Sequence, residues 1–270
     1  MPTTNSTISA AAPAFYNSAV IKASERFVLR GGSWSRIPLA VRYGRFYHPC
    51  CGQGLIDTGY TTRVTSGQRS SFLRLYTRLI APALTHESLE KIDPDTGAVL
   101  LTHLHADHAA GLHTAPHAQI YTSGAAYDDF CKMSARQRAM HGVFFELLPH
   151  DFERRMIRLE SLPQVEAPLG LGPAADLFGD ASVLAIPLPG HMQGHSGFLW
   201  TQPGSPLLYA ADTQWLHQAL VEARPPGPPL KWIMHDPVAA RQSCDRIQQF
   251  LKAGGSVVYC HDPDAGPWQI

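Results

Sequence analysis

Short apolar runs recur in both halves of the chain, and glycine, proline or polar residues separate them. Runs of about four to eight residues with such boundaries are typical of β-strands. The predicted strands are residues 26–29, 37–43, 54–57, 97–102, 119–122, 182–188, 197–201, 207–211 and 256–260.

Helical patterns lie between these strands. Apolar residues in 70–79 recur three and four positions apart, which is the spacing of a helix with one buried face. Asp236 supplies an N-cap and Pro237 suits the first helical position, while Gly254 and Gly255 end the helix that follows. Strands that alternate with helices, without a long linker, predict one α/β domain.

Two stretches depart from this alternation. Residues 1–25 are polar and alanine-rich around Pro13, so we expect a weakly structured lead-in to a single domain over 26–270. Residues 124–169 have an irregular helical pattern that prolines interrupt. This stretch is predicted to be a helical insertion that shapes a substrate site.

Composition narrows the possible partners. Of the 270 residues, 44% are apolar and 16% charged, and the formal net charge is zero. Without a basic field that could hold phosphate backbones, nucleic acid is not an expected partner. The five cysteines show no disulfide framework, and no apolar stretch approaches the length of about 18 residues that spans a bilayer. We therefore expect a cytoplasmic protein that acts on a small molecule and not at a membrane, and a homodimer is one candidate assembly.

A cluster of histidines follows the predicted strand 97–102. His103 and His105 are two positions apart, so their side chains lie on one side of an extended segment. Asp107 and His108 follow where the chain turns, and they can face a second metal. Because neutral imidazole and carboxylate are preferred ligands of zinc and similar ions, the cluster predicts a metal site.

Three further candidate ligands follow strands in the second half of the chain. His191, Asp212 and His261 each come after an apolar run, where a rigid scaffold can position a ligand. His235 is an alternative to His261 because both precede Asp-Pro, but His261 follows a strand whereas His235 precedes a helix. His195 is expected to support its loop.

The order of these motifs resembles that of the metallo-β-lactamase superfamily. The matching segments are Leu55-Ile56-Asp57-Thr58-Gly59, the His-x-His-x-Asp-His run of 103–108, Pro189-Gly190-His191, Ala211-Asp212 and Cys260-His261-Asp262-Pro263. The resemblance implies an α/β fold that is a four-layer αββα sandwich, with two mixed sheets face to face and helices outside.

The resemblance also implies two divalent metal ions, with zinc expected and manganese or iron as alternatives. Carried over residue by residue, His103, His105 and His191 would hold the first ion, Asp107, His108 and His261 the second, and Asp212 both. A shared carboxylate would offset the repulsion between two nearby cations. Asp57 is expected to be a supporting residue.

This ligand set implies a hydrolase in which a metal-bridging hydroxide attacks an electrophilic carbon or phosphorus. A metal lowers the pKa of bound water to about 7, and Asp107 is the candidate catalytic residue that carries a proton to the leaving group. The pattern is most similar to N-acyl homoserine lactone lactonases, which implies cleavage of an ester, lactone or thioester. A phosphodiesterase or nuclease of the same fold, and an iron-dependent sulfur dioxygenase, are the alternatives.

Two positions depart from the lactonase pattern. Those enzymes commonly carry a tyrosine three residues after the bridging aspartate, where this chain has Trp215. Met192 and Gln193 also replace the more usual Thr-Pro pair. Trp215 is a candidate substrate-binding residue, although core packing explains a tryptophan here equally well.

Overall fold

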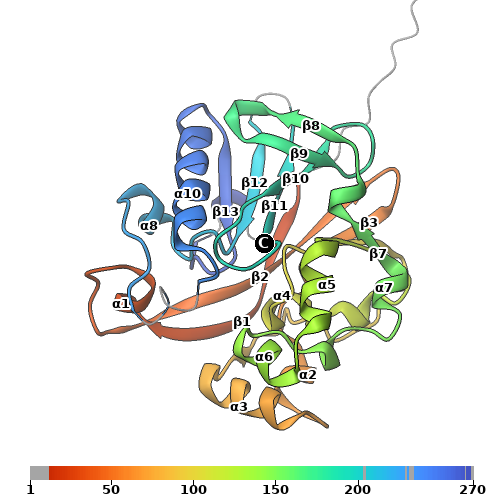
Figure 1. The fold of residues 1–270 in the computed structure, drawn as a ribbon, viewed down its shortest axis with the longest axis vertical. Coiled ribbons are helices and arrows are strands. Elements are labelled where there is room, and N and C mark those ends of the chain that lie inside the picture. The colour runs from red at the N-terminus through yellow and green to blue at the C-terminus, as the bar shows by residue number, and fades with distance from the viewer. Residues whose placement is uncertain (1–11, 203–204, 229, 231–233, 265, 269–270) are drawn as a thin grey trace, which may run out of the picture.

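Two mixed β-sheets form the centre of the protein (Figure 1). The computed structural model describes residues 12–202, 205–228, 230, 234–264 and 266–268. The first sheet has the order β4-β1-β2-β3-β5-β6-β7 and the second β13-β12-β11-β10-β9-β8. Each sheet combines parallel and antiparallel pairs, as expected from the sequence.

The strands of the first sheet are β1 (Ala14–Ser24), β2 (Arg36–His48), β3 (Gly52–Ile56), β4 (Ala83–Leu84), β5 (Thr96–Leu100), β6 (Gln119–Thr122) and β7 (Met156–Arg158). Those of the second are β8 (Gln164–Ala167), β9 (Gly172–Asp176), β10 (Val183–Pro187), β11 (Ser196–Trp200), β12 (Leu207–Ala211) and β13 (Ser256–Tyr259).

Helices connect and cover these strands. The α-helices are α1 (Glu25–Val28), α2 (Thr62–Thr65), α3 (Ser71–Ile80), α4 (Ala106–Ala109), α5 (Gly124–Lys132), α6 (Ala135–Met140), α7 (Phe152–Arg155), α8 (His217–Val221) and α10 (Pro237–Lys252). Short 3₁₀ turns are η1 (Leu112–Thr114), η2 (Phe145–Leu147), η3 (Leu159–Ser161), η4 (Pro168–Gly170) and η5 (Gly266–Trp268). None of the described helices is long and apolar enough to cross a membrane.

The two sheets pack face to face, and helices cover their outer faces. Phe15 of β1 stacks on Tyr209 of β12 with ring centroids 5.0 Å apart, within a core that both sheets share. Phe250 of α10 belongs to the same apolar cluster as Leu208, on the outer face of the second sheet, and Phe130 of α5 belongs to a cluster outside the first. Figure 1 shows α10 and α5 on opposite sides of the sheets. The expected four-layer αββα sandwich is confirmed.

The weakly structured lead-in expected over 1–25 is wrong for residues 14–24. These residues form β1, which pairs with β2 from Ala14 opposite Arg45 to Ser24 opposite Arg36. A register shift between Asn17 and Ala19 breaks the alternation of buried and exposed side chains, so the local pattern does not resemble a strand. Residues 1–11 lie outside the described part of the chain.

The strand expected over 26–29 is also wrong, because this segment forms the single helical turn α1. The backbone N–H of Leu29 donates to the carbonyl of Glu25 at 2.8 Å, as the chain reverses between β1 and β2. The apolar run Phe27-Val28-Leu29 is therefore a buried turn.

The helical insertion expected over 124–169 is helical only in part. α5, α6 and α7 lie in it, but β7 extends the first sheet and β8 is the edge strand of the second. Pro163 and the charged residues of 156–167 break the apolar pattern of these short strands, so the sequence did not predict them. The two strands in residues 156–167 are therefore part of the sandwich itself.

Candidate metal centre

Strand ends from both sheets meet at one edge of the sandwich. β5 leads into His103 and His105, while His191 follows β10, Asp212 follows β12 and His261 follows β13. Ligand atoms of His103, His105, His191 and Asp212 all lie within 4.8 Å of one another. The structure therefore brings side chains from distant parts of the sequence into one cluster.

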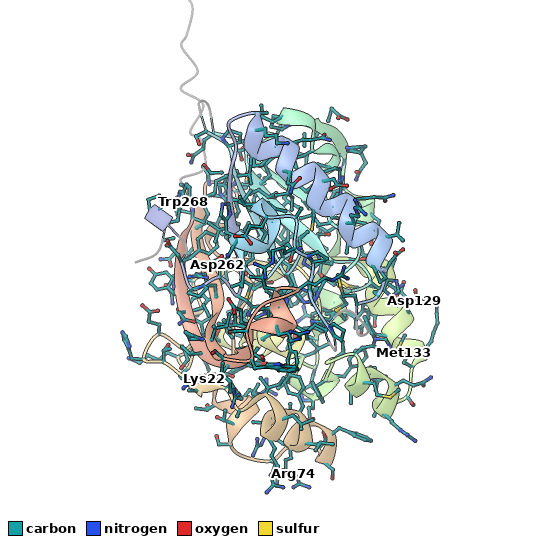
Figure 2. The ribbon with its side chains drawn as sticks, turned by 90° about the vertical axis from the view of Figure 1, so that its left-hand side faces the viewer. Lys22, Arg74, Asp129, Met133, Asp262 and Trp268 are labelled. Atoms are coloured by element: carbon teal, nitrogen blue, oxygen red, sulfur yellow. The ribbon has the colours of Figure 1, made fainter. Side chains whose placement is uncertain are left out.

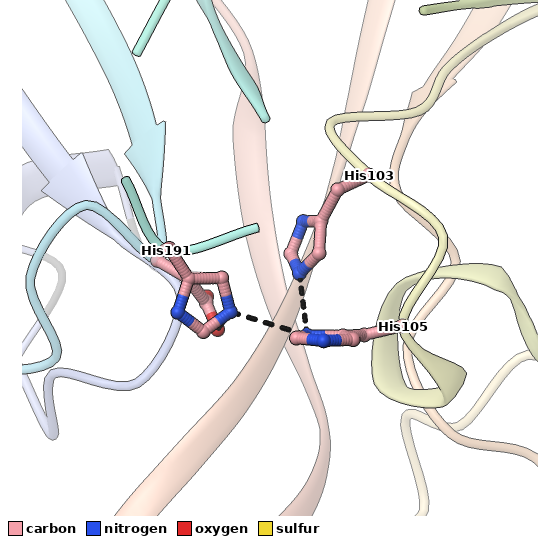
Figure 3. A group of neighbouring side chains, drawn as sticks. His103, His105 and His191 are labelled. Carbon is pink, nitrogen blue, oxygen red and sulfur yellow. Dashed lines mark hydrogen bonds and ion pairs between the residues drawn. The ribbon is translucent and has the colours of Figure 1, made fainter. Parts of the chain in front are cut away.

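The three histidines of this first group face one another in Figure 3. His103 Nε2 lies 2.9 Å from His105 Nδ1, and His191 Nε2 lies 3.1 Å from the same nitrogen. Three ring nitrogens that converge in this way form a donor set suited to one divalent cation.

A second group lies beside the first and shares Asp212 with it. The group comprises His108, Asp212, Cys260 and His261, with ligand atoms again within 4.8 Å. Asp107 joins it, because its Oδ2 lies 3.4 Å from His261 Nε2. Because Asp212 belongs to both groups, its carboxylate is placed where it could bridge two ions.

Cys260 was not among the predicted site residues. It is fully buried, and its thiol Sγ lies 3.7 Å from the carbonyl oxygen of Arg42. Its position directly before His261, inside a matched motif, was the only sequence signal for it.

Buried partners orient the histidines of the second group. Asp57 Oδ2 lies 2.7 Å from His108 Nδ1, and Asp57 Oδ1 accepts a hydrogen bond from the backbone N–H of Thr102 at 2.8 Å. His261 Nδ1 lies 2.7 Å from the carbonyl oxygen of Ala40. The contacts of Asp57 and Ala40 occupy Nδ1 of His108 and His261 and leave Nε2 of each ring for the centre. Asp57 thus has the supporting position expected from the sequence.

Arg42 holds the segment that carries His261. Its buried guanidinium donates to the carbonyl oxygens of Tyr259 and Cys260 at 3.3 Å, and also to that of Asp262. Because these carbonyls flank His261, Arg42 fixes the backbone on both sides of the imidazole.

His195 and His235 lie outside both groups. His195 Nδ1 lies 2.9 Å from the Leu188 carbonyl oxygen, and its Nε2 accepts a hydrogen bond from the backbone N–H of Asp212 at 3.2 Å. The backbone N–H of His235 donates to the His191 carbonyl. These contacts agree with the supporting role expected for His195 and with the choice of His261 over His235.

Two buried polar atoms in the cluster lack a hydrogen-bond partner among the described residues. They are His108 Nε2 and Asp212 Oδ1, which lie 3.4 Å apart. Leaving such a buried atom unpaired costs about 1–3 kcal/mol. A divalent cation would compensate both atoms, so the residues present fit a metal centre.

Burial and charge set the protonation of the cluster. Burial lowers the pKa of His105 to about 4 and holds those of His103 and His191 well below the usual range. Burial also opposes protonation of His108, but the charges of Asp57 and Asp107 outweigh it and raise its pKa. The first group therefore presents neutral imidazoles with free lone pairs, which is the form that binds metal.

The family model of the metallo-β-lactamase superfamily matches residues 55–260. This range contains the candidate ligands from His103 to Asp212 and ends directly before His261. The chain belongs to the metallo-β-lactamase superfamily.

Relatives within the superfamily include an N-acyl homoserine lactonase, AttM, from Azorhizobium caulinodans. It is 29% identical over 184 residues, and the match spans 65% of this chain and 62% of the relative. A variant of Bacillus thuringiensis AiiA, solved with N-decanoyl-L-homoserine bound at its active site, has a TM-score of 0.69 at 17% identity and covers 95% of each chain. AidC, a dizinc quorum-quenching lactonase in complex with a product, has a TM-score of 0.59 at 16% identity and covers 92% of this chain and 86% of its own.

In this protein, a cavity of about 510 Å³ adjoins the candidate metal centre. Its polar lining includes Asp107, His191, Asp212 and His261. Apolar side chains that line it include Ile21, Ile80, Phe130, Met133, Met192 and Leu230. The site thus combines a group of potential metal ligands with space for an apolar substrate portion.

Trp215 lines this cavity and is half-buried. Its ring centroid lies 4.9 Å from that of His261, and it also packs against an apolar cluster around α2 and α3. Both interpretations of this tryptophan, substrate contact and core packing, therefore have a structural basis.

Tyr60 and Tyr76 also line the cavity, and neither was predicted from the sequence. Tyr60 directly follows the matched segment that ends at Gly59, which was its only signal. Tyr76 appeared as one of the apolar positions of the predicted helix 70–79.

Proposed function

We propose that this protein is a dinuclear metal-dependent hydrolase that opens the lactone ring of N-acyl homoserine lactones or cleaves related esters and thioesters. The observation that carries the proposal is the apolar cavity that ends at the ligand cluster. The lactonase relatives support the choice of a lactone within the superfamily.

His103, His105 and His191 would hold one ion, Asp107, His108 and His261 the other, and Asp212 both. Zinc fits this set of imidazole nitrogens and carboxylate oxygens, as manganese or iron also do. When bound, the ions would lower the pKa of a water molecule to about 7 and polarise the carbonyl group of the substrate.

Asp107 is the proposed proton carrier. Its carboxylate lines the cavity, and the nearby His108 and His261 hold its pKa below the usual range although burial opposes this. The attacking water adds its oxygen to the acyl carbon, and the C–O bond of the ester then breaks. Asp107 passes the proton of that water to the departing oxygen, so no proton is gained or lost by the site.

The cavity disfavours a phosphodiesterase or nuclease. No lysine or arginine lies among its described lining residues, and the chain has no net charge that would attract a polyanion. An iron-dependent dioxygenase would use a similar donor set. Metal analysis of protein purified without added metal separates that activity from hydrolysis.

A substrate panel tests the proposal. Zinc-, manganese- and iron-loaded protein is assayed against N-acyl homoserine lactones, aryl esters, thioesters and phosphodiesters. We expect lactone hydrolysis that a chelator abolishes and added metal restores. Turnover of phosphodiesters alone, or hydrolysis that survives complete metal removal, would overturn the proposal.

Asp212→Ala tests the dinuclear arrangement. We expect the variant to lose the binding of about two ions per chain and to lose turnover by about 100-fold or more, because Asp212 belongs to both groups. Metal content by mass spectrometry and kcat/KM on a lactone are the measurements. Asp245→Ala is the control, because Asp245 is an exposed aspartate on α10 outside both groups. Retention of both properties by Asp212→Ala would contradict a shared carboxylate.

A further inference from the structure

Two tyrosine hydroxyls meet beside the candidate metal centre. Tyr60 lies in the loop after β3, three residues beyond Asp57, and Tyr76 lies on α3. Their Oη atoms are 2.5 Å apart, and both residues line the cavity together with Asp107 and His261. Neither residue has a part in the chemistry described so far.

The framework holds this pair firmly. Tyr60 is 1% exposed, and its backbone N–H donates to Ser18 Oγ at 3.0 Å. The ring of Tyr76 packs on Phe144, with centroids 5.1 Å apart. On the outer side of α3, Arg74 points away from the protein (Figure 2), whereas Tyr76 is on the side of the cavity. The two hydroxyls are therefore positioned before any ligand binds.

The pair has one proton more than its mutual hydrogen bond uses. Two phenols carry two O–H protons, and a single bond between them consumes one. Among the described residues, no other hydrogen bond of either hydroxyl is present. Tyr60 is the more deeply enclosed residue, and an unpaired buried donor is costly, so Tyr60 donates to Tyr76 Oη. The proton of Tyr76 is then available to an acceptor in the cavity.

The surroundings of both phenols favour their neutral, proton-donating form. Burial raises the pKa of Tyr60 and that of Tyr76, and the negative charge of Asp107 raises both further. Both tyrosines line the same cavity as Asp107 and His261 of the second ligand group. That is the side on which Asp107 is proposed to deliver a proton.

We propose that Tyr76, supported by Tyr60, donates a hydrogen bond to the oxygen that departs when the ester or lactone bond breaks. This inference rests on the proposed function. As the C–O bond breaks, its electron pair moves to the departing oxygen, which accepts the Tyr76 hydrogen bond and receives its proton from Asp107. Tyr76 keeps its own proton, so the step needs no further acid.

The basicity of the departing oxygen provides the kinetic test. Tyr76→Phe is expected to lower kcat/KM for a lactone or an alkyl ester by about 10–100-fold, because an alkoxide needs stabilisation as it departs. The loss for a p-nitrophenyl ester should stay within about threefold, since nitrophenolate departs without such help. Tyr60→Phe should have a smaller effect, because Tyr60 only supports Tyr76.

Tyr43→Phe is the matched control. Its hydroxyl donates to the carbonyl of Glu87 at 2.9 Å, and Tyr43 does not line the cavity. The substitution removes a partly buried tyrosine hydrogen bond elsewhere and should leave both substrates unaffected. Equal losses on the lactone and the p-nitrophenyl ester in Tyr76→Phe would overturn the proposal.

A binding comparison gives a readout that does not depend on turnover. N-hexanoyl-L-homoserine carries the free hydroxyl of an opened lactone, and N-hexanoyl-L-2-aminobutyrate lacks only that hydroxyl. By calorimetry, the metal-loaded wild type should bind the first acid about tenfold more tightly, and Tyr76→Phe should lose most of this preference. A preference that persists in Tyr76→Phe, with an unchanged melting temperature, would overturn the proposal.

The two proposals can fail separately. A wild-type protein that hydrolyses neither lactone nor alkyl ester would remove the proposed function, and the binding comparison would still decide whether Tyr76 recognises the hydroxyl. A wild-type protein that hydrolyses the lactone, with a Tyr76→Phe variant equal to it on every substrate, would remove only the role of Tyr76.

Discussion

Asp57 combines a strained backbone conformation with a side chain that orients His108 in the candidate metal centre. Its φ of 52° lies in the left-handed region, which few side chains other than those of asparagine and aspartate tolerate well. Its carboxylate accepts from the Thr102 backbone and contacts His108 Nδ1. The surrounding hydrogen bonds maintain this conformation, and in return the loop fixes the orientation of a candidate ligand.

Asp57→Asn is predicted to weaken metal binding at the second group by about 10–100-fold, because a neutral amide supports His108 less well than a carboxylate. Asparagine tolerates the same backbone conformation, so the fold should persist. Competitive zinc titration measures the effect. Asp180→Asn is the control, since Asp180 Oδ2 lies 3.1 Å from His48 Nε2, outside the cavity. Equal affinities in both variants would contradict the supporting role of Asp57.

At the scale of elements, α10 holds the turn that carries His191. The N–H of Asp236 donates to the carbonyl of Gly190 at 2.9 Å, and Ser243 Oγ donates to that of Pro189 at 2.8 Å. Gly190 has a φ of 131°, and a Cβ at this position would come within 2.2 Å of Ala240 N. The close approach of turn and helix therefore requires glycine.

Gly190→Ala is predicted to destabilise the protein by more than about 2 kcal/mol and to lower metal occupancy, because the clash displaces His191. Gly254→Ala is the control that introduces backbone strain without a clash. Gly254 has a φ of 97°, and nothing lies within 4 Å of the added Cβ. It should cost about 1–2 kcal/mol and leave metal binding intact. Urea unfolding and metal analysis distinguish the two. Equal metal content in the variants would show that the turn does not depend on α10.

At the scale of the whole molecule, the candidate metal centre joins the two sheets. The residues 103–108 come from the first sheet, and His191, Asp212 and His261 come from the second. The backbone N–H of Ala40 in β2 also donates to the His261 carbonyl at 3.2 Å. Bound metal would therefore link the two halves of the sandwich.

Metal removal is predicted to lower the melting temperature by roughly 5–10 °C. An ion present at 100 times its dissociation constant contributes about 2.7 kcal/mol, and each kcal/mol corresponds to about 2–4 °C for a domain of this size. Scanning calorimetry with a chelator, and then with zinc restored, measures the shift. Asp212→Ala should show little change in melting temperature when metal is removed, because this variant is expected to bind less metal. If the melting temperature of the wild type does not change when metal is removed, the centre does not link the two sheets.

Local pattern accounts for much of the fold. β5, β12 and β13 are apolar runs with clear boundaries, so the sequence predicted both the strands and the polar residues at their ends. Local pattern failed at β1, whose register shift breaks the alternation, and at α1, a single turn made from an apolar run. It also missed β9, whose Gly-Pro-Ala-Ala-Asp sequence contains no large apolar residue.

The sequence by itself determined which side chains are available to bind metal, because their chemical type and their place after strands are local properties. Only the tertiary structure decided that Asp57 orients His108, that Cys260 joins the second group and that Tyr60 meets Tyr76. These contacts join residues that are far apart in the sequence, and no local pattern of apolar and polar residues predicts such contacts. They depend on how the two sheets and α3 pack, which is a property of the whole fold.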